Sequence, residues 1–143
     1  NGEPSMTAFG EHLVINNANS NYKDEYMFRL AETYLLRAEA YLGKGDKGSA
    51  TKDINIIRTR ANAAPIDESR MDIDFLLDER LRELYFEEFR MITLTRMGKL
   101  VDRARRYNPK TGPTIDDYHN LWPIPYSEIE RNINAKIEQN PGY

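Results

Sequence analysis

The sequence predicts an all-α protein, and three observations support that prediction. Apolar residues recur at three- and four-residue steps over two stretches, 23–61 and 72–97, which is the period of an amphipathic helix. Glycine and aspartate stand where such helices would end and begin. Five of the seven prolines follow Asn108, so the end of the chain is expected to be irregular. We therefore expect a helical hairpin, a long central helix and an irregular proline-rich C-terminal segment.

The hairpin is expected to occupy residues 23–61. Its first helix should span 23–42 and end at Gly43 and Gly45, since glycine enters the left-handed backbone region freely. Asp46 is then expected to cap a second helix that runs to about residue 61. The polar residues 1–22 before the hairpin predict an extended lead-in with one short strand at residues 13–15.

The central helix is expected to begin at Asp72 or Asp74 and to continue as one element to about residue 97, before Gly98. It is apolar on both sides of its helical wheel, as is typical of a helix packed on both sides. One side also carries charges whose like-charged neighbours need cationic partners, for which Arg80, Arg29 and Arg37 are candidates. We predict that this row is a structural ion network; its members are Glu79, Glu83, Glu87 and Arg90.

Two shorter elements are expected beyond the central helix. A basic stretch at 99–107 follows Gly98. A helical turn is expected at 127–131, where Ser127 and Glu130 have the spacing of a capping box.

Composition excludes several functional classes. The chain has no cysteine, so neither a thiolate nucleophile nor a cysteine zinc site is possible. A net charge of −3 does not favour nucleic-acid binding, and no apolar run is long enough to span a membrane. His12 and His119 are isolated in sequence, which predicts surface or hydrogen-bonded residues rather than metal ligands. We expect no metal, no cofactor and no catalytic residues.

Two kinds of residue still have a functional interpretation. The glutamate row could supply a general acid and base, although structural ion pairs are the better interpretation because an unpaired buried charge is strongly unfavourable. Aromatic side chains in the irregular segments could stack on a sugar ring or simply pack on the core. The weak candidates for ligand binding are Tyr107, Tyr118 and Trp122.

The motifs resemble known families. Tyr34-x2-Arg37-Ala38-x2-Tyr41 followed by Ala50-x3-Ile54 resembles a tetratricopeptide hairpin. Three further segments, in order and at the right spacing, resemble the SusD/RagB family of outer-membrane nutrient-binding lipoproteins. They begin at Arg29-Leu30-Ala31-Glu32, at Glu79-Arg80-x-Arg82-Glu83 and at Leu121-Trp122-Pro123-Ile124-Pro125, the last continuing to Gln139-Asn140-Pro141-Gly142-Tyr143.

The SusD/RagB resemblance implies a binding protein without catalysis. It implies a polysaccharide or oligosaccharide ligand, a SusC-like TonB-dependent transporter as partner, and a cell-surface location on the outer membrane through an upstream lipid anchor. Residues 23–143 would form the C-terminal helical domain of a longer chain, preceded by the lead-in at 1–22, with ligand residues mostly upstream. The alternatives are a tetratricopeptide-type protein–protein adaptor and a glycoside hydrolase that uses two of the glutamates.

Overall fold

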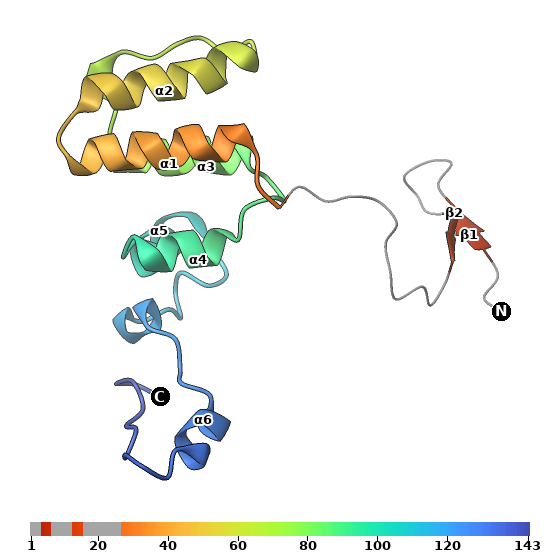
Figure 1. Cartoon of the computed structure of the whole chain (residues 1–143), viewed down its shortest axis with the longest axis vertical. Helices are drawn as coiled ribbons and strands as arrows, with labels where there is room; N and C mark the ends of the chain where they lie inside the picture. The colour runs from red at the N-terminus through yellow and green to blue at the C-terminus, as the bar shows by residue number, and fades with distance from the viewer. Residues whose placement is uncertain (1–3, 7–12, 16–26) are drawn as a thin grey trace.

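The structure is a computed structural model that describes residues 4–6, 13–15 and 27–143. This part of the chain is helical except for one pair of short strands, in agreement with the predicted helical class (Figure 1). The elements in order are β1 (Pro4–Met6), β2 (Leu13–Ile15), α1 (Leu30–Gly43), α2 (Lys47–Arg60), α3 (Ile73–Glu83), α4 (Arg90–Arg96), α5 (Leu100–Tyr107) and α6 (Tyr126–Arg131), with 3-10 turns at Glu68–Arg70 and Asp117–Asn120.

The strand expected at residues 13–15 is present as β2. It pairs antiparallel with β1, so that Ser5 lies opposite Val14. The start of the first helix was predicted wrongly. Residues 23–26 lie outside the described residues, while 27–29 precede the helix and Arg29 is extended, with φ −141° and ψ 161°. Helix α1 therefore begins at Leu30.

The turn of the predicted hairpin is formed as expected. Gly45 adopts φ +78°, which glycine reaches without a Cβ penalty, and the chain then reverses. The carboxylate of Asp46 accepts a hydrogen bond from the backbone N–H of Ser49 at 2.9 Å, which caps α2. That hydrogen bond holds the pKa of Asp46 below its ordinary value. Helices α1 and α2 consequently lie side by side (Figure 1).

The predicted single central helix is wrong, because two helices replace it. Asp72 does cap α3, its carboxylate accepting from the N–H of Phe75 at 2.7 Å. The helix stops at Glu83, however, and α4 begins only at Arg90. In the connecting loop Phe86 has φ +64°, a conformation that a helix cannot contain. Periodicity continues through this loop in the sequence, so periodicity alone could not locate the break.

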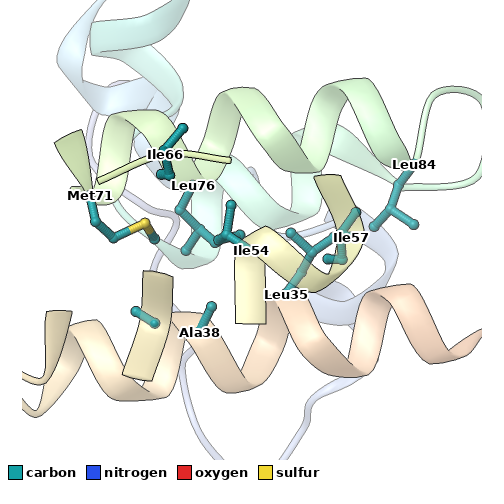
Figure 2. Packing of buried hydrophobic residues seen from close by; sticks show 9 residues of the cluster. Leu35, Ala38, Ile54, Ile57, Ile66, Met71, Leu76 and Leu84 are labelled. Atoms are coloured by element: carbon teal, nitrogen blue, oxygen red, sulfur yellow. The ribbon is translucent and has the colours of Figure 1, made fainter. Parts of the chain in front are cut away.

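The hydrophobic core lies between α1, α2 and the segment that leads into α3. Figure 2 shows apolar side chains from these elements pointing toward one another. Leu35, Ala38, Ile54, Met71 and Leu76 are fully buried, and Leu84 closes the cluster where α3 ends. Since packed apolar area is the main favourable term in folding, this cluster stabilises the packing of α1, α2 and α3.

The C-terminal part is irregular, as the prolines predict. Gly98 has φ +62° and separates α4 from α5, so the predicted break is present. The predicted turn at 127–131 is present as α6, but its capping box is not: the N-cap is Pro125, and no side chain caps the helix. A capping box forms instead at Asp116 and His119, ahead of the turn Asp117–Asn120.

The last residues are tied back onto the loop before α6. The side-chain amide of Gln139 pairs with the backbone of Ile124 in both directions, at 2.8 Å each. The Asn140 amide donates to the carbonyl of Trp122 at 2.6 Å. These bonds give the irregular segment a defined path. No helix in the described part of the chain is both long and apolar enough to cross a membrane.

Candidate functional site

The predicted glutamate row meets arginines from three parts of the chain. Glu79 accepts from Arg58 of α2 at 2.8 Å and from Arg82 at 2.6 Å. Glu83 accepts from Arg29 at 2.6 Å and from Arg60 of α2 at 2.6 Å. Arg29 also pairs with Glu87. Each carboxylate of the row thus forms an ion pair with at least one guanidinium group.

Two members of the row occupy different positions from those predicted. Glu87 lies in the loop after α3, and Arg90 begins α4, so they do not continue the face that carries Glu79 and Glu83. Arg90 pairs with the carboxylate of Glu88 at 3.3 Å, and in the described part of the chain it has no ion pair with Glu79, Glu83 or Glu87. Burial lowers the pKa of Arg90, although the neighbouring carboxylate favours its charged form. The face predicted from the helical wheel therefore ends with α3.

The partner arginines were only partly foreseen. Of the candidates, Arg29 does reach the row, whereas Arg37 forms a two-bond pair with Asp53, at 2.7 Å for each bond. The hydrogen bonds with Asp53 raise the pKa of Arg37. Arg58 and Arg60 of α2 were missed. The sequence did carry a signal for them, because both are basic residues in the last turn of α2, a helix that packs beside the acidic helix α3.

A buried ion pair holds the loop between α3 and α4. The Nε of Arg80 donates to the carboxylate of Glu88 at 2.6 Å, and these side chains are only 2% and 4% exposed. The hydroxyl of Thr93 donates to the same carboxylate at 2.9 Å. A carboxylate so deeply buried is stable as an ion only when donors surround it. The pair is compatible only with the broken helix, because a continuous α3 would carry Glu88 away from Arg80.

A hollow with a volume of about 890 Å³ lies beside α4 and α5. Helix α5 contributes Tyr107 and the loop before α6 contributes Trp122, so two of the three predicted aromatic candidates line it. The third, Tyr118, is not in the wall but stacks on His119, which is. The residues that line the hollow are Asp78, Leu81, Arg90, Met91, Leu94, Leu100, Arg103, Ala104, Tyr107, Asn108, Thr111, Thr114, Ile115, His119, Trp122, Pro123 and Tyr143.

Several aromatic rings line this hollow or support residues that line it. The rings of Tyr118 and His119 stack at 4.0 Å between centroids, and the ring of Tyr143 meets Tyr118 edge-on at 5.1 Å. The Tyr143 hydroxyl donates to the carbonyl of Leu121 at 2.9 Å. The indole N–H of Trp122 lies 3.4 Å from the hydroxyl of Thr95, which orients the ring. The sequence did not single out Tyr143 or His119 for this site.

Polar groups also line the hollow. Arg103 is buried and pairs with Asp78 and, at 3.0 Å, with Asp74. Its guanidinium lies over the ring of Tyr107, 4.8 Å from the centroid, which fixes that ring by a cation–π contact. Burial acts to raise the pKa of Asp74, but hydrogen bonds from Arg106 and Arg103 hold it below its ordinary value. The wall therefore combines a rigid aromatic surface with ionised groups.

The glycine before Tyr143 is required for this arrangement. Gly142 has φ +97°, and a Cβ placed there would clash with Cγ of Tyr118. We expect Gly142→Ala to detach the terminal segment and to make amide exchange at Ile124 and Tyr143 roughly tenfold faster or more, because the added methyl group meets both strain and a clash. Hydrogen–deuterium exchange measures this.

The matched control is Gly43→Ala. Gly43 lies at the end of α1, where an added Cβ meets nothing within 4 Å. It should leave exchange in the terminal segment unchanged. Equal exchange in the Gly142→Ala variant and the unchanged protein would contradict the assigned packing.

The carboxylates offer no evident metal site. Among the residues that the structure describes, no group of three or more histidine, cysteine, aspartate or glutamate side chains is placed to hold a metal ion. The arginine-bound glutamates form connections between helices, and the hollow combines apolar and aromatic walls with a few polar groups. That combination is typical of a small-molecule binding site. The fold and the site thus describe a helical binding module.

The chain belongs to the SusD family, whose family model matches residues 9–143. The family resemblance noted in the sequence is therefore confirmed. Proteins of this family are non-enzymatic binding proteins, typically lipoproteins at the cell surface. The interpretation of the glutamate row as a hydrolase site is thereby set aside.

Similar proteins are much longer than this chain. The starch-binding protein SusD of Bacteroides thetaiotaomicron is 40% identical over 121 residues, which cover 82% of this chain and 21% of that protein. SusD-like protein P25 of Formosa agariphila is 33% identical over 141 residues, covering 90% and 26%. The solved structure BT4246 shares the fold with a TM-score of 0.62 at 23% identity, covering 81% of this chain and 23% of that one. The chain thus spans about a quarter or less of each.

Proposed function

We propose that this chain is scaffold from the C-terminal part of a cell-surface glycan- or nutrient-binding protein that delivers its ligand to a SusC-like TonB-dependent transporter. The family membership supports this proposal, and so does a relative that is named as starch-binding. In the proposed protein, residues 1–22 are a lead-in, 23–143 form the C-terminal helical domain, and a lipid anchor elsewhere in the protein holds it on the outer membrane.

The observation that carries the ligand class is the aromatic hollow. Its volume of about 890 Å³ lies within the range of small-ligand sites, which is roughly 300–1,000 Å³. Tyr107 and Trp122 present half-exposed rings into it, and flat amphipathic rings match the apolar C–H faces of sugars. Asn108 and Asp78 lie in the same wall and can bond to sugar hydroxyls. We therefore assign Tyr107 and Trp122 as stacking residues for an oligosaccharide and Tyr118 as support beneath His119.

A titration with maltoheptaose, a soluble fragment of starch, tests this assignment. Trp122 is the single tryptophan of the chain, so its fluorescence reports on the hollow directly. We expect a saturable change in its emission with a millimolar dissociation constant. Tyr107→Ala should weaken binding roughly tenfold, because it removes a stacking contact worth about 1.5 kcal/mol.

The control is Tyr126→Ala. Tyr126 is an exposed tyrosine of α6 that does not line the hollow, and its removal should leave the titration unchanged. Constant tryptophan emission up to about 10 mM sugar would contradict a glycan site in the hollow. The assignment would also be contradicted if Tyr126→Ala weakened binding as much as Tyr107→Ala.

The alternative function is a tetratricopeptide-type adaptor for a protein partner. The hairpin of α1 and α2 favours it, since such hairpins present a binding face when they stack. In the described residues this hairpin packs against the single helix α3 rather than against a second hairpin. The membership in a family of binding proteins also favours the glycan-binding proposal.

A further inference from the structure

Large apolar side chains gather where α1 begins and where the chain passes from α3 to α4. Met27 and Phe86 are 96% and 93% exposed, and Phe89 is 80% exposed. Single exposed hydrophobic residues are common on protein surfaces, whereas a cluster of several large ones marks an interaction surface. We call this cluster the apical patch; its residues are Met27, Phe28, Leu30, Tyr85, Phe86 and Phe89.

The two halves of the apical patch are joined by Arg29. Its guanidinium pairs with Glu83 at 2.6 Å and also with Glu87, so the start of α1 is fastened to the loop after α3. Figure 1 shows the start of α1 and that loop meeting at the same end of the helical unit. Exposed apolar residues that are distant in sequence are therefore held at the same end of the helical unit.

The loop half of the patch has a defined conformation. Phe86 has φ +64°, which a bulky side chain adopts only when its surroundings impose it. The buried pair of Arg80 and Glu88 holds the loop on its inner side. The rings of Tyr85 and Phe86 meet edge-on at 4.5 Å between centroids, so they support each other. The aromatic rings are thus held outward by ordered backbone.

Charge and chain length together indicate what covers the patch. The guanidinium of Arg29, beside the patch, is paired with the carboxylates of Glu83 and Glu87, so it is not a free positive charge that would select an anionic surface. The helices of this chain match about a quarter or less of their relatives. In those proteins the matched region lies within a chain about four times as long or more, so residues outside that region are available to cover the patch.

We propose that the apical patch is an internal docking surface, covered by an apolar surface from the part of a SusD-family protein outside the region that this chain matches. The loop between α3 and α4 is then a preformed wedge for that contact. The positive φ of Phe86 and the buried pair of Arg80 and Glu88 hold the rings of Phe86 and Phe89 toward the rest of the fold.

Maleimide labelling of a new cysteine tests this proposal, since the chain has no cysteine of its own. The Phe86→Cys variant is prepared in the chain alone and in a chimaera, in which this chain replaces the matched part of the starch-binding protein SusD. Mass spectrometry follows modification at position 86. We expect rapid labelling in the chain alone and labelling slower by roughly tenfold or more in the chimaera.

The matched control is Tyr126→Cys, at an exposed aromatic position outside the patch, which should label at the same rate in both proteins. Equally rapid labelling of position 86 in both would overturn the proposal, whether the chimaera leaves the patch open or fails to fold. Sedimentation of the unlabelled chain tests whether a second copy of the chain covers the patch instead. A dimer that Phe86→Ser together with Phe89→Ser converts to monomer would assign the patch to a second copy instead.

Discussion

The Glu88→Leu variant is expected to lose about 3–5 kcal/mol of unfolding free energy, the largest effect of any single substitution considered. Removing this carboxylate leaves Arg80, whose side chain is 2% exposed, as a buried charge without its closest partner. It also deprives the hydroxyl of Thr93 of its acceptor. The free energy of unfolding, measured by urea titration and circular dichroism, checks this. A small domain has only about 5–15 kcal/mol in total, so the variant should be close to unfolding.

A double variant separates the pair from the general damage of substitution. Arg80→Met combined with Glu88→Leu should recover most of the lost stability, because two apolar side chains can fill the space without an unpaired charge. Glu128→Leu, at an exposed position of α6, serves as a control and should change stability by less than about 0.5 kcal/mol. A double variant as unstable as Glu88→Leu would show that the loop needs the ion pair itself.

The Glu83→Gln variant is expected to lose about 2 kcal/mol of stability, the second largest effect. Its carboxylate is 7% exposed and receives guanidinium groups from the start of α1 and from the end of α2. A neutral amide cannot accept both bonds with the same strength, so both contacts weaken. Such a loss would support the predicted structural role of the glutamate row, which stays a prediction until it is measured.

The comparison variant is Glu87→Gln. Glu87 shares the partner Arg29 but its side chain is 32% exposed, so solvent screening should limit its loss to less than about 1 kcal/mol. Urea unfolding of both variants in low and high salt adds a further check, because the more exposed pair is the more strongly screened. Equal small losses for both glutamates would contradict a structural role that depends on burial.

Local signals in the sequence were sufficient for several elements. Asp46 was predicted as a helix cap, and so was either Asp72 or Asp74; Asp46 and Asp72 each accept a hydrogen bond from the backbone N–H three residues later. Gly98 was predicted to separate two elements, and its backbone has the positive φ that favours glycine there. These interactions span only a few residues, so their geometry depends on neighbours that the sequence itself specifies. The family, too, could be recognised from the order and spacing of three segments.

Only the tertiary structure decided the other features. The central helix breaks because Glu88 must return to Arg80 in the interior, and periodicity does not report such a demand. Arg58 and Arg60 reach the glutamate row because α2 packs beside α3, across separations of more than twenty positions. The hollow likewise joins Tyr107 of α5 to Trp122 and Tyr143. Contacts between distant segments depend on how the helices are placed, and that placement follows from packing of the whole core.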